Sequence, residues 1–164
     1  MIELIVIDVD GTLTDGKIYY SNEGDEIKAF NIKDGLMIKS WNMLGKKSAI
    51  ITGRTSKIVE KRAKELDISI VKQGIKDKKA ELDQIIKDLG ISYANVAVIG
   101  DDMNDYNILS RVKYSFSPFD ANNFIQDIVK YRLHTKGGEG CVAEMINILI
   151  KKEKLEDKFL KLWI

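Results

Sequence analysis

Uninterrupted aliphatic runs alternate along the chain with segments whose apolar residues recur at helical spacing. The aliphatic runs, residues 4–9, 48–52 and 96–99, lack polar alternation, which predicts parallel strands covered on both faces. Helical spacing marks residues 35–44, 56–66 and 78–89, and Gly90 follows as a helix C-cap. This order predicts an α/β fold, with a mainly parallel sheet between two layers of helices and ligands bound at the carboxyl ends of the strands.

A shorter pattern interrupts this alternation after the first predicted strand. Two β-prone stretches, residues 17–20 and 26–30, flank the turn-rich connector SNEGD. They predict a hairpin that projects over about residues 17–30. The pattern fits a plain decoration as well as a functional flap above the strand ends.

Composition limits the classes of protein that the chain can belong to. The 164 residues, 45% of them hydrophobic, suit one domain over residues 1–164. Lys plus Arg number 26 against 25 for Asp plus Glu, so we expect no nucleic-acid or membrane partner. No apolar run approaches the roughly 20 residues of a membrane span. Cys141 is the only cysteine and Met1 leads directly into a strand, so we expect a reducing, cytoplasmic setting.

Polar residues stand where each of the three aliphatic strands ends. The first strand ends in DVDGT, the second in TGR and the third in GDDMND. Each cluster alone is a weak signal, because Asp and Asn also cap helices, and residues 103–112 have a helical pattern. If the strands are neighbours, however, all three clusters meet in one crevice and bring at least three carboxylates together. Such crowding favours a bound cation, and the all-oxygen ligand set predicts Mg²⁺ rather than zinc.

An aspartate pair beside Mg²⁺ suits phosphoryl transfer. Asp8, the last residue of its strand, is a candidate nucleophile that would form an aspartyl-phosphate. Asp10, facing the same way in an extended chain, would protonate the leaving alkoxide and then activate water. Thr52 offers a hydroxyl group from the second strand. Lys78, at the start of a predicted helix, either neutralises charge in the site or lies in solvent like most helical lysines.

Four features of the chain resemble, in order, the four signature motifs of haloacid dehalogenase superfamily phosphatases. They are DVDGT at residues 8–12, Thr52, Lys78 and GDDMND at residues 100–105, and the similarity covers nearly the whole chain. The resemblance implies a Rossmann-like three-layer fold. It implies that Asp8 is the nucleophile, that Asp10 is the general acid and base, and that Thr52 and Lys78 bind the phosphoryl group.

The same resemblance implies a metal site. Mg²⁺ would be held by Asp8, the carbonyl of Asp10 and Asp101, with Asp102 or Asp105 as outer support.

The spacing of the motifs narrows the subfamily. Residues 53–77, 25 in all, separate Thr52 from Lys78, and the 41 residues 11–51 are used by the hairpin, one helix and one strand. No cap domain fits, so the site would be open to water unless another subunit covers it. With TDGKIYYSNEGDEIKAFNIKDG after the first motif, the chain resembles the tetrameric 3-deoxy-D-manno-octulosonate 8-phosphate (KDO 8-phosphate) phosphatases. The resemblance implies a homotetramer built by the hairpin, in which neighbouring subunits contribute to each site.

Substrate contacts are also implied by this resemblance. They fall on Asn31, Ile32, Lys33, Asp34, Gly35, Arg54, Arg62, Lys78 and Asn104. Arginines suit a substrate that carries a carboxylate besides its phosphate, although Arg62 also fits a solvated helix face. The tail, residues 151–164, fits an amphipathic helix docked on its own domain, and in the family it can reach a neighbour's site.

The implied reaction is hydrolysis of KDO 8-phosphate to KDO and phosphate, in lipopolysaccharide sugar biosynthesis. Phosphatases of nine-carbon 2-keto acid 9-phosphates, such as KDN or N-acylneuraminate 9-phosphate, share the motifs. The position of Arg54 tends to be acidic in that branch, which favours the eight-carbon acid, whereas Glu139 stands where the eight-carbon enzymes often carry Arg. A general sugar phosphatase also fits.

Two readings without enzymatic turnover remain. A phospho-aspartate receiver is disfavoured because its acidic pair precedes the phosphorylated aspartate, which lies on a later strand. An inactive scaffold is disfavoured because no catalytic position is replaced. We expect His134, in a late edge strand, and Cys141, at the start of an apolar helix, to be structural.

Overall fold

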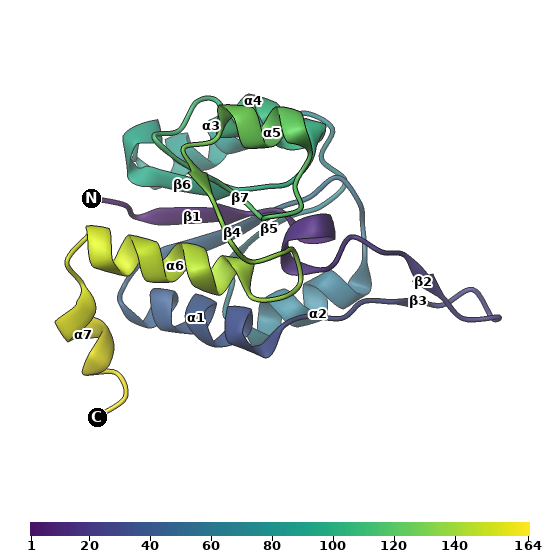
Figure 1. The fold of residues 1–164 in the computed structure, drawn as a ribbon, viewed down its shortest axis with the longest axis horizontal. Helices are drawn as coiled ribbons and strands as arrows, with labels where there is room; N and C mark the ends of the chain where they lie inside the picture. Colours follow the sequence, from purple (N-terminus) through teal and green to yellow (C-terminus); the bar gives the residue numbers. More distant parts are fainter.

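The computed structural model describes all residues, 1–164, and shows three layers (Figure 1). The central sheet has six strands in the order β5-β4-β1-β6-β7-β8, and every neighbouring pair is parallel. Its strands are β1 (Leu4–Ile7), β4 (Lys47–Ile51), β5 (Ile70–Lys72), β6 (Val96–Ile99), β7 (Tyr114–Ser117) and β8 (Tyr131–Arg132). The α/β fold predicted from the aliphatic runs is confirmed.

Helices cover both faces of the sheet (Figure 1). One face carries α1 (Ile32–Met43), α2 (Lys57–Glu65) and α6 (Cys141–Lys152), and the other carries α3 (Lys78–Leu89), α4 (Tyr106–Leu109) and α5 (Asn123–Ile128). Between Thr52 and Lys78 the chain forms only α2 and β5, so no cap domain is present, as the spacing predicted. None of the helices combines the length and apolar character needed to cross a lipid bilayer.

The alternation of buried side chains along β1 explains its sequence. Ile5 and Ile7 join the apolar cluster on the side of α1 and α6, whereas Leu4 and Val6 join the cluster on the side of α3 and α4. Because both faces of the strand are covered, every position must be apolar. This arrangement fixes the end of β1, and with it Asp8, in the middle of the sheet.

The hairpin projects from the body of the molecule after β1 (Figure 1). Its paired strands are short, β2 (Tyr19–Tyr20) and β3 (Glu26–Ile27), and they run antiparallel. The predicted hairpin is present, with fewer paired residues than the β-prone stretches suggested.

Two local predictions were wrong in detail. Directly after Asp8 the chain does not stay extended but makes a tight turn, η1 (Val9–Leu13), with a φ of 99° at Gly11. The helix predicted over residues 103–112 is a 3-10 turn, η3 (Met103–Asp105), followed by the short α4, which ends at Leu109. The 3-10 turn lets Asp105 Oδ2 fold back and accept the N–H of Asp101 at 3.1 Å.

The C-terminal tail forms the short helix α7 (Glu156–Leu160), at the end of the molecule remote from the hairpin (Figure 1). Leu155 is buried and Phe159 packs partly against the core on the α6 side. Leu160, Trp163 and Ile164 are exposed. The tail therefore docks on its own domain through its first half and leaves an apolar second half in solvent.

Candidate active site

A pocket of about 300 Å³ opens at the carboxyl ends of β1, β4 and β6. It is lined by residues from the three segments predicted to converge, namely Asp8, Asp10, Thr52, Gly53, Arg54, Asp102, Met103 and Asn104. The polar ends of three distant strands therefore meet at one place, which is the crevice expected of a parallel α/β sheet.

Three carboxylates gather beside this pocket. Asp8, Asp101 and Asp105 each offer an oxygen atom, and these atoms lie within 4.8 Å of one another. Burial, reinforced by repulsion from a neighbouring carboxylate of the cluster, raises the pKa of each of the three to about 7. A hard divalent cation with oxygen ligands would relieve this repulsion.

Lys78 lies inside the site rather than in solvent. It is the first residue of α3, and its Nζ donates to Asp8 Oδ1 and to Asp105 Oδ1, both at 2.6 Å. Burial alone would lower the pKa of this lysine, but the two carboxylates outweigh burial and raise the pKa. Lys78 is thus a charged group held against the candidate nucleophile.

Gly11 allows Asp101 to approach the first motif. A Cβ atom at Gly11, where φ is +99°, would lie 2.0 Å from Asp101 Oδ2, so a side chain there would be strained and would displace Asp101. Thr12 Oγ1 donates to Asp101 Oδ1 at 3.1 Å. No sequence pattern indicated this role of Thr12.

Asp10 has a partner that the sequence did not indicate. Lys28 Nζ, from the hairpin, donates to Asp10 Oδ1 at 2.5 Å. A hairpin lysine is ordinarily solvated, and the two residues belong to different local patterns. No periodicity or motif could have joined them.

Arg54 and Asp102 have partners of their own. Arg54 Nη2 donates to Glu26 Oε1 at 3.1 Å. Asp102 Oδ1 accepts the N–H of Met103 at 2.8 Å and an N–H of the Asn122 side chain at 3.2 Å. Of the two predicted outer residues, Asp105 therefore joins the carboxylate cluster and Asp102 caps η3.

The segment from Asn31 to Gly35 does not line this pocket. Asn31 caps α1, because its Oδ1 accepts the N–H of Lys33 at 2.8 Å. Asp34 is buried, and its Oδ1 accepts the N–H of Ala143 at the start of α6. Ile32 and Lys33 are exposed. The role of the whole segment in substrate binding stays a prediction. The capping roles of Asn31 and Asp34 were not predicted.

Arg62 is not part of an ordinary solvated helix face. Its guanidinium lies 5.6 Å from the centre of the Phe30 ring. A Cβ atom at Gly35 would lie 2.5 Å from Arg62 Nη2. Arg62 therefore packs against the start of α1, away from the pocket lined by Asp8.

His134 and Cys141, which were expected to be structural, lie outside the carboxylate cluster, and His134 is exposed. The backbone N–H of His134, just beyond β8, donates to Glu144 Oε1 at 3.0 Å. Cys141 is buried at the start of α6, and its Sγ donates to the carbonyl of Thr12 at 3.2 Å. Burial raises the pKa of the Cys141 thiol, so it is a poor nucleophile.

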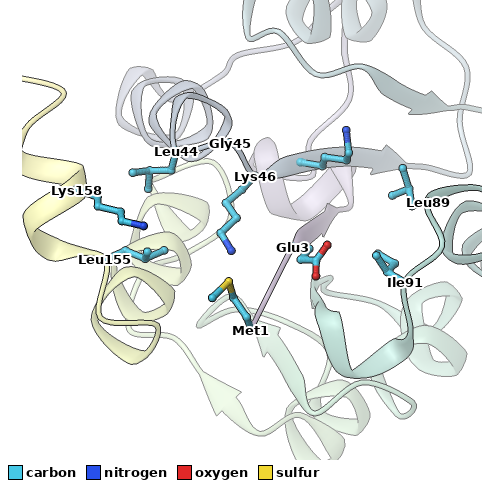
Figure 2. Close-up of a pocket in the computed structure, with 10 residues that line it drawn as sticks. Met1, Glu3, Leu44, Gly45, Lys46, Leu89, Ile91, Leu155 and Lys158 are labelled. Carbon is cyan, nitrogen blue, oxygen red and sulfur yellow. The ribbon is translucent and has the colours of Figure 1, made fainter.

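A second cavity, of about 340 Å³, lies at the amino ends of β1 and β4 (Figure 2). Apolar residues such as Leu44, Leu155 and Ile91 share its lining with Lys46, Lys47 and Lys158, and Glu3 is its only acidic residue. It therefore cannot assemble a carboxylate cluster like the one at the carboxyl ends of the strands.

The site and the fold together define a hydrolase of the haloacid dehalogenase type. The defining features are the parallel sheet, the aspartate pair after β1, the buried lysine and the acidic loop after β6. A model of the haloacid dehalogenase-like hydrolase family matches residues 68–146. The chain is 38% identical over 149 residues to the KDO 8-phosphate phosphatase KdsC of Escherichia coli K12, covering 91% of this chain and 79% of that protein. It is 38% identical over 156 residues to KdsC of Yersinia pestis, covering 94% and 83%.

Comparison with solved structures indicates the same family. The KDO 8-phosphate phosphatase of Moraxella catarrhalis, in complex with a magnesium ion, a phosphate ion and KDO, superposes with a TM-score of 0.95 at 37% identity, covering 99% of this chain and 94% of that one. The enzyme of Yersinia pestis gives 0.91 at 37% identity, covering 94% and 84%. The chain belongs to the KDO 8-phosphate phosphatase family.

Proposed function

We propose that this chain is a Mg²⁺-dependent phosphatase that hydrolyses KDO 8-phosphate to KDO and phosphate through an aspartyl-phosphate on Asp8. The proposal rests on the cluster at the end of β1. There Asp8 Oδ1 accepts a hydrogen bond from Nζ of buried Lys78 at 2.6 Å, and Asp8 lies beside Asp101. Nucleophile, fixed positive charge and metal ligand are then in one place. The names and bound molecules of the relatives support the substrate.

The residues present fit a magnesium ion. Asp8 and Asp101, with the carbonyl of Asp10, would hold it, and Asp105 adjoins them in the same cluster. Bound Mg²⁺ supplies positive charge that offsets the charge of the phosphoryl group.

Different side chains of this chain then act in different steps of the reaction. An oxygen of Asp8 attacks phosphorus while the bond to the leaving alkoxide breaks, and Asp10 gives that alkoxide its proton. Lys78 neutralises charge on the phosphoryl group. Water next attacks phosphorus, Asp10 takes a proton from it, and the bond to Asp8 breaks to release phosphate.

Arg54 supports a sugar acid as the substrate. It lines the same pocket as Asp8 and Asp10, and its guanidinium is partly exposed beside Glu26. A carboxylate of the substrate would compete with Glu26 for this arginine. Asn104 lines the pocket beside it.

We further propose that the chain acts as a cytoplasmic homotetramer in lipopolysaccharide sugar biosynthesis. The projecting hairpin carries exposed Ile18, Tyr20 and Ile27, an apolar surface that another subunit would cover. In the segment from Asn31 to Gly35, Ile32 and Lys33 are exposed outside the pocket of their own chain and would serve a neighbour's site. The exposed end of the tail would do the same.

The substrate is tested by comparing kcat/KM for KDO 8-phosphate, KDN 9-phosphate and glucose 6-phosphate, with Mg²⁺ present. We expect KDO 8-phosphate to exceed the other two by at least about tenfold, which corresponds to roughly 1.4 kcal/mol in transition-state binding. A preference for the nine-carbon acid would overturn the choice of substrate, whereas absence of phosphate release from all three would overturn the phosphatase.

The role of Arg54 is tested in the same assay. Arg54→Met should raise KM for KDO 8-phosphate and leave KM for p-nitrophenyl phosphate, which has no carboxylate, nearly unchanged. Arg132→Met, at an arginine of the edge strand β8, is the control. Equal effects of Arg54→Met on both substrates would exclude carboxylate recognition by Arg54.

A further inference from the structure

We propose that Lys28, on the hairpin, is a positioning residue that holds the carboxylate of Asp10 where it protonates the leaving group. The inference rests on the proposed phosphatase activity and adds a residue that lies outside the four signature motifs. It makes the base of the hairpin a part of the active site within a single chain.

The position of Lys28 is unusual for a hairpin lysine. Its side chain is only 2% exposed, whereas the side chain of Lys17, on the same hairpin, is 73% exposed. Covering a lysine ammonium is costly unless acidic partners compensate. Lys28 Nζ has two such partners, Asp10 Oδ1 at 2.5 Å and Glu26 Oε1 at 3.0 Å. The two carboxylates outweigh burial and raise the pKa of Lys28.

The carboxylate of Asp10 accepts no other hydrogen bond. Lys28 is the only residue that donates a hydrogen bond to it, and the chain turns sharply at the next residue, Gly11. The side chain of Asp10 is 25% exposed. An aspartate with free χ angles on a turn would sample several orientations. Transfer of a proton to the leaving oxygen requires one of them.

The two aspartates of the first motif are therefore held by different lysines. Lys78, from α3, bonds Asp8, and Lys28, from the hairpin, bonds Asp10. One element fixes the nucleophile and another fixes the proton donor. This division gives the hairpin a function besides that of an assembly surface.

The contact continues from Lys28 toward the substrate pocket. Glu26 Oε1 accepts from Lys28 and also from Arg54 Nη2 at 3.1 Å. Charges alternate in sign along Asp10, Lys28, Glu26 and Arg54. The hairpin is thereby tied both to the proton donor and, through Arg54, to the loop that follows β4.

The test uses the dependence of the reaction on its leaving group. A p-nitrophenolate ion leaves without a proton, whereas the alkoxide of an alkyl phosphate needs one. The value of kcat/KM reports the steps up to formation of the aspartyl-phosphate. The alkyl phosphate used is whichever of KDO 8-phosphate, KDN 9-phosphate and glucose 6-phosphate wild type hydrolyses with the highest kcat/KM. For Lys28→Met we expect kcat/KM with this substrate to fall at least about 10²-fold. With p-nitrophenyl phosphate we expect a change of less than about fivefold.

Conservative and control variants separate positioning from folding. Lys28→Arg, which keeps the charge, should restore the alkyl phosphate reaction to within about tenfold of wild type. Lys17→Met removes an exposed lysine of the same hairpin and should change neither reaction. Should Lys28→Met fail to fold by circular dichroism, Lys28→Gln provides the same comparison with a polar side chain.

Two outcomes would overturn the inference in different ways. Equal loss on both substrates in a folded Lys28 variant, without rescue by arginine, would show that Lys28 only supports the fold while the phosphatase assignment stands. If wild type releases phosphate from neither substrate, the proposed function fails, and the inference about Lys28 fails with it.

Discussion

Asp8 and Asp10 are separated by one residue, yet their carboxylates accept hydrogen bonds from two lysines that lie in different parts of the chain. Lys78 and Lys28 supply these charges. The motif DVD predicted the aspartates, and strand order predicted their meeting with Asp101. The pairing of Asp10 with Lys28 could not be predicted, because it depends on where the base of the hairpin lies relative to the turn after β1.

Gly11 is a residue where the site tolerates little change. In Gly11→Ala, the new Cβ would meet Asp101 Oδ2 at 2.0 Å in a backbone with φ of +99°. Asp101 would have to move away from Asp8, so we expect kcat to fall at least about 100-fold, with a loss of about 1–3 kcal/mol in the free energy of unfolding. Phosphate release and urea unfolding measure the two effects.

A matched glycine separates strain from displacement of Asp101. Gly45 also has a positive φ, +79°, and a Cβ there would meet nothing within 4 Å. Gly45→Ala should lower stability and leave kcat unchanged. Unchanged kcat in Gly11→Ala would contradict the role given to Asp101.

The elements differ in how far their sequences reveal them. β1, β4 and β6 were predicted because strands covered on both faces are continuously aliphatic. β5 and β7 were not predicted. β5 has three residues, all half-buried, and β7 reads YSFS, in which Ser115 and Ser117 are buried despite being polar. Such strands leave too weak a hydrophobic signal.

Asp34 joins two helices that are distant in the sequence. It lies in the first turn of α1, and its Oδ1 accepts the N–H of Ala143 in α6 at 2.7 Å. The partners are 109 residues apart, so no local pattern indicates the contact. Burial raises the pKa of Asp34 to about 6 from 3.8.

This carboxyl should make the stability of the fold depend on pH. The folded chain keeps the proton of Asp34 to a higher pH than the unfolded chain, so ionisation at Asp34 lowers the free energy of unfolding as pH rises from about 4 through 6. Asp34→Asn keeps the hydrogen-bond acceptor and cannot ionise. We therefore expect the stability of Asp34→Asn relative to wild type to increase by about 2 kcal/mol between pH 4 and pH 8.

Urea unfolding at several pH values measures this difference. Asp25→Asn, at an exposed hairpin carboxylate, is the control. A difference for Asp34→Asn that does not change with pH would contradict the burial of an ionisable group at the junction of α1 and α6.

At the scale of the whole molecule, the carboxylate cluster should couple metal binding to pH and to stability. Asp8, Asp101 and Asp105 have pKa values raised to about 7 in the metal-free protein, so below that pH protons compete with Mg²⁺ for the same oxygens. We expect Mg²⁺ to raise the melting temperature more at pH 8 than at pH 6. Differential scanning calorimetry with Mg²⁺ or with EDTA measures the two shifts.

Asp101→Asn removes one proposed ligand and is the comparison for that experiment. The shift caused by Mg²⁺ should nearly vanish in this variant at both pH values. A shift in wild type that is equal at pH 6 and pH 8 would contradict binding of the ion by these carboxylates.

The hairpin should decide the assembly of the molecule. Ile27 is 56% exposed on the hairpin, and in a tetramer built by this element it would be buried between subunits. We expect wild type to have the mass of a tetramer in light scattering after size-exclusion chromatography. Ile27→Asp should have a smaller mass, because an unpaired charge would be buried between subunits. Met43→Asp, at a 59% exposed position at the end of α1, should leave the mass unchanged. A tetrameric Ile27→Asp would exclude this interface.

Phosphate release from KDO 8-phosphate by wild type and by Asp8→Asn, each with Mg²⁺ and with EDTA, tests the central claim most directly. We predict steady release by wild type with Mg²⁺, none above background with EDTA, and a loss of at least about 10³-fold in folded Asp8→Asn. Comparable turnover by Asp8→Asn, or a stable, stoichiometric phosphorylated wild-type chain without turnover, would contradict it.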